Sequence, residues 1–224
     1  MPSELHTERR GTTLVLTLSD RATRNLLSAQ LFSAGVEALN VAESDPGVRC
    51  VVVHGDGEHF SAGIEAAEAS LLAQALDGCS QFVEALRACP KPVVAAVEGV
   101  AAGVGFSLAL ACDLVVAAED SRFSLTPAET GLALDGGGRW HLAQRLPRAL
   151  GLQFIWLPEP LSAQRLHALG LVNWVVERGQ ALGHACAVAE RLAQLAPDAL
   201  AAAKDLVDQR PRQLLSEHLA RQVL

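Results

Sequence analysis

The chain has 224 residues, of which 50% are hydrophobic and 4% aromatic, and its formal net charge is −7. A chain of this length can bury a sizeable core in one domain. Lys and Arg form no long run, which argues against a nucleic-acid partner, and no charge-free apolar stretch reaches the roughly 18 residues of a membrane span. The five cysteines form no CxxC pair and the charged N-terminus is unlike a secretory signal, so we expect a reducing cytoplasm.

The predicted elements alternate between strands and helices over most of the chain. Alternating or β-branched apolar runs predict strands at 12–18, 48–53, 93–97, 114–118 and 171–176. Helical spacing predicts helices at 26–42, 65–76, 81–88, 104–112, 136–146 and 162–169. The run at 104–112 is apolar on every side, which indicates a helix buried all round.

From residue 181 onward the pattern is entirely helical. Pro197 and Pro211 separate predicted helices at 181–195, 198–208 and 212–224. We therefore predict an α/β body over 1–180 and a helical region over 181–224. The last helix reaches Leu224 without a capping residue, so we expect the natural chain to continue.

Two glycine loops carry the chemical prediction. The first loop holds Ala62, Gly63 and Ile64, and the second holds Gly103 and Val104. Each loop places a backbone N–H where it can stay unpaired, and two such donors aimed at one point would hold a developing oxyanion. Val104 opens the apolar helix, so its N–H has no intrahelical acceptor and lies at the positive end of the helix dipole. The alternative is that Gly103 and Gly105 only allow close helix–strand packing.

A series of short motifs resembles the crotonase family, also called the enoyl-CoA hydratase/isomerase family, over about 12–207. The motifs are Asp20-Arg21 with Asn25, Phe60-Ser61-Ala62-Gly63, Pro90-Lys91-Pro92-Val93, Ala101-Ala102-Gly103-Val104-Gly105, Ala111-Cys112-Asp113, Arg122-Phe123, Asp135-Gly136-Gly137-Gly138 and Gly170-Leu171-Val172-Asn173. The resemblance implies a spiral of ββα turns, a C-terminal helical trimerisation region, and a homotrimer or hexamer. It also implies an acyl-CoA thioester of fatty acid metabolism as substrate, with coenzyme A as part of that substrate and no tightly bound cofactor. The amides of Ile64 and Val104 would form the oxyanion hole.

The sequence departs from the family at the two glutamates of its hydratases, whose positions fall on Ser107 and Pro127. The two-glutamate lyase route is therefore not expected, and we favour an isomerase over a hydratase. Ser107 is expected to bond back to its helix or to hold a water near the substrate. The chain also lacks the lysine that relatives often place just after the first loop for the CoA phosphates, which leaves Arg21, Arg24 or the C-terminal helices as candidates.

One carboxylate, Asp135, stands at a position that resembles the acid of double-bond isomerase members of the family. Leu132 and Trp140 are predicted to surround it and to raise its pKa. The alternative is that Asp135 only caps a helix start, and Glu129 is a second candidate base. A hydratase with an atypical base, or an acyl-CoA-binding protein without catalysis, remains open. The histidine spacing predicts no metal site.

Overall fold

The computed structural model describes residues 3–64, 69–125, 136–157 and 159–220. Its main sheet has six strands in the order β1 (Glu4–Arg10), β2 (Thr13–Ser19), β3 (Cys50–Gly55), β4 (Val93–Val97), β6 (Leu114–Ala118) and β9 (Trp174–Val176). β1 is antiparallel to β2, and the remaining neighbours are parallel. A second sheet has three strands, β5 (Val100–Ala102), β7 (Arg122–Ser124) and β8 (Leu161–Ser162).

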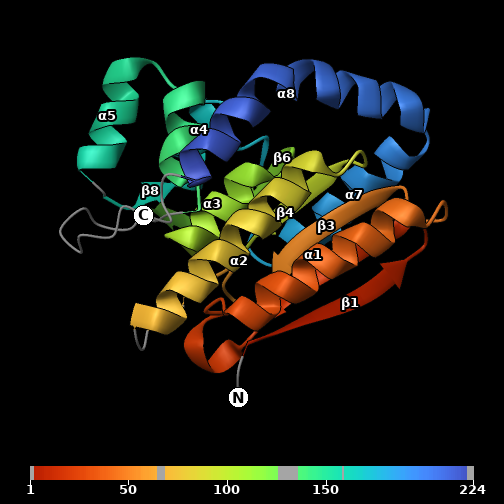
Figure 1. Ribbon diagram of the computed structural model, residues 1–224, viewed down its shortest axis with the longest axis horizontal. Coiled ribbons are helices and arrows are strands. Elements are labelled where there is room, and N and C mark those ends of the chain that lie inside the picture. The colour runs from red at the N-terminus through yellow and green to blue at the C-terminus, as the bar shows by residue number, and fades with distance from the viewer. Residues whose placement is uncertain (1–2, 65–68, 126–135, 158, 221–224) are drawn as a thin grey trace.

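Helices cover the main sheet on both faces. In chain order, the helices of the described residues are η1 (Arg21–Thr23), α1 (Ala29–Ser44), α2 (Ala69–Ala88), α3 (Val104–Ala111), α4 (Gly138–Arg145), α5 (Arg148–Trp156), α6 (Ala163–Ala168), α7 (Ala181–Ala193) and α8 (Pro197–Ala220). Figure 1 shows α1 and α2 side by side across the front of the sheet, with α8 along the top of the molecule. Among the described residues, no helix is both long enough and apolar enough to cross a bilayer.

The central strands are buried on both faces, as their β-branched runs predict. Val51 and Val53 of β3 belong to the main core with α1, α2 and α3. The alternate residues Cys50 and Val52 face the other way and pack against α7, whose contact face is largely alanine. Parallel strands covered on both faces lose the polar alternation of a half-exposed strand, which explains why the sequence reads as a continuous apolar run.

The chain advances in strand–strand–helix turns. β4, β5 and α3 form one turn, and β6, β7 and α4 form the next. Isolated parallel bridges, Leu27 with Ile64 and Ser61 with Ala101, continue the small sheet back into the earlier turns. This arrangement is the ββα spiral expected from the family resemblance, and helices are present at the C-terminus as predicted.

Two predicted helix breaks are wrong. The helices predicted at 65–76 and 81–88 are one helix, α2, in the described range Ala69–Ala88. Gly78 lies between the two predicted ranges and lets α2 approach α1, because a Cβ at Gly78 would lie 3.3 Å from the Cβ of Phe32. The helices predicted at 198–208 and 212–224 also join, since α8 continues through Pro211. An internal proline removes one backbone hydrogen bond and can bend a helix without ending it.

Several elements are not predicted from the sequence, and β1 and α5 are the longest of them. β1 is an edge strand in which six of seven residues are exposed, so it carries no apolar alternation. α5 buries only Gly151 and Phe154 and exposes 67% of Trp156, so its apolar spacing is weak. Both elements are held by their neighbours: β1 pairs along its whole length with β2, and α5 packs on α4.

Candidate active site

Two loops that are distant in the sequence lie against each other beyond β3 and β4. The Ser61 N–H donates to the Val100 carbonyl oxygen at 3.0 Å, and the Ser61 carbonyl accepts from the Ala102 N–H at 2.9 Å. Gly105 fits closely onto the same residue, because a Cβ at Gly105 would lie 2.7 Å from the Cβ of Ser61. The two glycine loops singled out in the sequence are therefore in direct contact.

In the first loop, every amide before Ile64 is already engaged. Phe60 donates to the carbonyls of Glu98 and Val100, Ser61 to Val100, Ala62 to the carbonyl of Arg24, and Gly63 to Oγ of Ser61. Across the described part of the chain, the Ile64 N–H has no acceptor. Gly63 has a φ of 119°, a conformation that favours glycine, and it turns the chain just before this amide.

The second loop ends in the same way, at Val104. The Gly103 N–H donates to the Ser124 carbonyl at 2.8 Å, and Gly103 has a φ of 51°. Val104 follows as the first residue of α3, and its N–H also has no acceptor among residues that the structure describes. All eight residues of α3 are buried, so the positive end of its dipole acts in a poorly solvated region. The two amides lie on adjoining loops, which is the arrangement that the oxyanion prediction requires.

The glycine run at 136–138 lies directly over the start of α3. A Cβ at Gly136 would be 3.5 Å from the Cβ of Ser107 and 3.7 Å from Cγ1 of Val104, and a Cβ at Gly138 would be 2.4 Å from Oγ of Ser107. The N-cap of α4 is Gly137, which makes no side-chain cap. Asp135 lies outside the described residues, so the alternative that it only caps this helix start stays a prediction.

Ser107 lies one turn inside α3 and is fully buried. Its Oγ donates to the Gly103 carbonyl at 3.2 Å, which confirms the predicted bond back to the helix. A serine hydroxyl that donates to a backbone carbonyl cannot act as a carboxylate base. Ser107 therefore does not replace the glutamate that hydratases of the family have at this position.

Of the remaining residues predicted for the catalytic site, only Trp140 lies in the described part of the chain. Asp135, Glu129 and Leu132 lie outside the described residues, as does Pro127. Trp140 is buried on α4, and its ring stacks edge-on against His141 with centroids 5.1 Å apart. Both rings line a cavity next to α8, and this cavity is not lined by the two glycine loops.

That cavity has a volume of about 590 Å³ and lies between α8 and the body, near the C-terminal ends of α2 and α3. Two ion pairs line it: Arg87 with Asp208, and Lys204 with Asp113 at 2.8 Å. Arg145 donates to the Leu110 carbonyl at 2.8 Å. Burial of this guanidinium away from water lowers its pKa to about 10. Neither Ile64 nor Val104 lines the cavity, so its charges serve the packing of α8 and not the loop amides.

A smaller recess of about 310 Å³ contains the arginines considered for the CoA phosphates. Arg21 makes two hydrogen bonds to the Asp56 carboxylate, at 2.6 and 2.8 Å, and this guanidinium holds the pKa of Asp56 below its usual value. Arg24 lines the same recess and its side chain is exposed. Among described side chains, no three His, Cys, Asp or Glu groups gather as a metal site would require.

Sequence reasoning listed Asn25 as a family motif but not as part of the site. The structure buries Asn25 and joins its side chain to the start of the first loop, which is 31 to 35 residues away in sequence. An asparagine between polar turn residues gives little signal by itself. The left-handed conformation of Asn25, with a φ of 58°, is visible only in the structure.

The comparisons with known proteins agree with this architecture. A family model described as enoyl-CoA hydratase/isomerase matches residues 8–223, and the chain belongs to this family of acyl-CoA enzymes. A 2,3-dehydroadipyl-CoA hydratase of Escherichia coli is 35% identical, with 98% of this chain and 88% of the relative covered. A carnitinyl-CoA dehydratase of Salmonella enteritidis is 36% identical over 92% of this chain and 80% of that protein.

Solved structures show the same fold. An enoyl-CoA hydratase from Polaromonas sp. JS666 superposes with a TM-score of 0.87 at 42% identity, covering 98% of this chain and 91% of the other. One from Mycobacterium avium subsp. paratuberculosis superposes with a TM-score of 0.90 at 32% identity, covering 98% and 90%. The names of these four relatives describe hydratases and a dehydratase.

Proposed function

We propose that the protein binds an acyl-CoA thioester and stabilises its enolate through the amides of Ile64 and Val104. The single observation that carries this proposal is a pair of N–H groups, on two loops joined at Ser61, that have no acceptor among the described residues. A backbone donor of this kind is worth about 10²–10³ in rate when aimed at a developing oxyanion. Ala62, Gly63 and Gly103 then act as the substrate-contacting backbone around the thioester.

The favoured reaction is migration of a carbon–carbon double bond in an enoyl-CoA. The Asp135 carboxylate removes a proton from the carbon alpha or gamma to the thioester carbonyl, and the electron pair moves onto the carbonyl oxygen. The same carboxyl then returns the proton to the other carbon as the enolate collapses. Two described residues support this placement: Gly136, the residue next to Asp135, lies against the side chain of Val104, and Ser107 offers no second base.

The test is turnover of a short 3-enoyl-CoA by the wild type and by Asp135→Asn. Loss of a general acid–base costs about 10²–10⁴ in rate, so we expect kcat to fall by at least 10² with little change in KM. Glu129→Gln tests the second candidate, and Asp77→Asn, an exposed α2 residue, is the matched control. Equal rates for wild type and Asp135→Asn would remove Asp135 from the mechanism.

Hydration or dehydration is the second candidate, and the names of the relatives favour it. Product analysis separates the reactions, because hydration adds the mass of water and gives a 3-hydroxyacyl-CoA, whereas isomerisation leaves the mass unchanged. Binding of acyl-CoA with no product from either direction would instead support a non-catalytic acyl-CoA-binding protein.

We further propose a homotrimer or hexamer, located in the cytoplasm. The support is exposed apolar side chains near the C-terminus: Leu206 and Val207 of α8 are 78% and 73% exposed, and Leu195, between α7 and α8, is 51% exposed. Neighbouring apolar side chains such as Leu206 and Val207 are candidates for packing against another protein surface. Light scattering coupled to size-exclusion chromatography would give three or six times the mass of 23.6 kDa, and a monomeric mass would contradict the proposal.

A further inference from the structure

The first glycine loop is hydrogen-bonded to a turn more than thirty residues earlier in the chain. The Ala62 N–H donates to the Arg24 carbonyl at 2.9 Å, and the Leu27 N–H donates to the Gly63 carbonyl at 2.8 Å. The second bond holds the carbonyl of the peptide group that carries the Ile64 N–H, and the first holds the Ser61–Ala62 peptide group shortly before it. The position of the Ile64 N–H therefore depends on residues 24–27.

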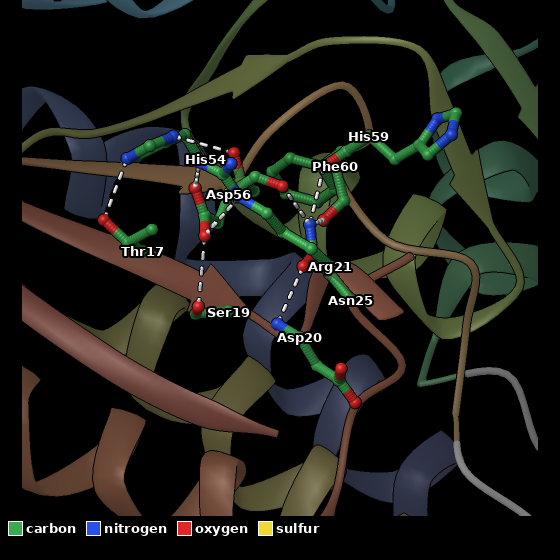
Figure 2. Close-up of polar contacts among 10 residues, drawn as sticks. Thr17, Ser19, Asp20, Arg21, Asn25, His54, Asp56, His59 and Phe60 are labelled. Atoms are coloured by element: carbon green, nitrogen blue, oxygen red, sulfur yellow. Dashed lines mark hydrogen bonds and ion pairs between the residues drawn. The ribbon is translucent and has the colours of Figure 1, made fainter. Parts of the chain in front are cut away.

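Asn25 ties this turn to the beginning of the same loop. Its Nδ2 donates to the carbonyls of His59 at 2.8 Å, Asp56 at 3.0 Å and Phe60 at 3.4 Å, and its Oδ1 accepts from the Asp20 N–H at 2.9 Å. Figure 2 shows the Asn25 amide between Asp20 and the carbonyls of this segment. Asn25 is 1% exposed, so these bonds form out of contact with water and are costly to lose.

The turn also holds an unfavourable backbone conformation. Arg24 and Asn25 have φ values of 59° and 58°, and they are the two non-glycine residues with positive φ in the described ranges. Such conformations cost on the order of 1–3 kcal/mol each and persist where surrounding contacts enforce them, often at functional sites. Two consecutive residues are held this way where the Arg24 carbonyl must face the Ala62 amide.

We propose that Asn25 is a positioning residue for the oxyanion hole, holding the 56–64 segment so that the Ile64 N–H faces the thioester oxygen. Asn25 acts through the loop and does not touch the substrate. The inference rests on the proposed oxyanion function and adds to it a residue outside both glycine loops. A misplacement of about 1 Å at a catalytic donor can cost about 10²-fold in rate, so a small shift of this loop has a measurable effect.

The first experiment compares Asn25→Asp and Asn25→Gly with the wild type. Asn25→Asp keeps the size and the acceptor for Asp20 but turns a carboxylate oxygen toward the His59 and Asp56 carbonyls. Asn25→Gly removes the side chain while tolerating the positive φ, so backbone strain cannot explain its effect. We expect kcat to fall by about 10² in both variants, with KM within a few-fold of the wild type.

Asn173→Asp is the control variant, at an exposed asparagine away from the loops. The Asn173 side chain also accepts one backbone hydrogen bond, from the Val115 N–H at 2.8 Å, but it lies at the β6–β9 edge of the sheet. We expect its kcat to stay near that of the wild type. Thermal unfolding of each variant fixes a temperature at which all of them are folded, and the kinetics are measured there.

A spectroscopic readout separates positioning from general structural damage. In isotope-edited infrared difference spectra of bound butyryl-CoA, an oxyanion hole lowers the thioester carbonyl frequency relative to free ligand. We expect this shift in the wild type and in Asn173→Asp, and its loss in both Asn25 variants although butyryl-CoA still binds. A full shift in either folded Asn25 variant would overturn the inference and leave the oxyanion proposal standing. Absence of the shift in the wild type would overturn both.

Discussion

The backbone groups at the two ends of helix α3 differ in their hydrogen bonding. At its N-terminal end, the Val104 N–H has no acceptor in the described part of the chain, beside a loop whose Ile64 N–H is likewise unengaged. At its C-terminal end, the Leu110 carbonyl receives the Arg145 guanidinium, and two ion pairs lie close by. Buried polar groups are normally satisfied, so the satisfied end indicates structure and the unsatisfied end indicates a ligand.

Substitution of Arg87, a residue of α2 that lines the cavity near the C-terminal end of α3, should lower stability and leave the chemistry unchanged. Arg87→Met breaks the buried ion pair between Arg87 and Asp208, and breaking such a pair costs about 3–5 kcal/mol of the free energy of unfolding. Urea denaturation measures the loss, and kcat is measured where the variant is folded. The double variant Arg87→Met/Asp208→Leu should recover most of the stability, since both charges are then removed. A catalytic defect in folded Arg87→Met would contradict this division between the two ends.

Substitution at the N-terminal end of α3 should instead lower activity and leave stability nearly unchanged. Val104→Pro deletes one amide while placing proline at the first helical position, where its fixed φ is well tolerated. We expect kcat to fall by about 10²–10³, equivalent to about 2.7–4 kcal/mol of transition-state stabilisation, with a nearly unchanged unfolding midpoint. Val104→Ala, which keeps the amide and shortens the side chain, is the control. Full activity in Val104→Pro would exclude this donor.

The smallest expected effect concerns the thiol that ends α3. Cys112 is 1% exposed, and burial raises the pKa of its thiol to about 12. At pH 8 only about one molecule in 10⁴ would carry the reactive thiolate, so iodoacetamide should label Cys112 only through unfolding. Cys186 is partly exposed and serves as the internal reference that should react first. Rapid labelling of Cys112 in the native protein, detected by peptide mass spectrometry, would mean that this end of the helix opens.

The elements that the sequence predicts best are those whose pattern depends on local contacts. The predicted bounds of β4 and β6 are the observed ones, because each is a short apolar run with clear polar or proline neighbours. The glycine loops are also predicted, since Gly63 and Gly103 occupy backbone conformations that other residues rarely adopt. In contrast, the predicted break between 76 and 81 is wrong, because this segment is helical and Gly78 packs against Phe32 of α1.

Contacts between distant residues account for what the sequence does not reveal. Arg87 and Asp208 are 121 residues apart and become partners only when α8 folds over the body. The same limit applies to Asn25, whose three acceptors lie on another turn of the spiral. The proposed acid–base residue Asp135 is known from the family resemblance, and its role stays a prediction until the kinetics are measured.

A crystal structure of the protein with a bound, unreactive acyl-CoA would test the central claim most directly. The account predicts that the thioester oxygen lies within about 3.2 Å of both the Ile64 and the Val104 nitrogen atoms, as two hydrogen bonds require. A thioester oxygen bound elsewhere, or an Ile64 or Val104 amide that donates to a protein carbonyl in the complex, would contradict it.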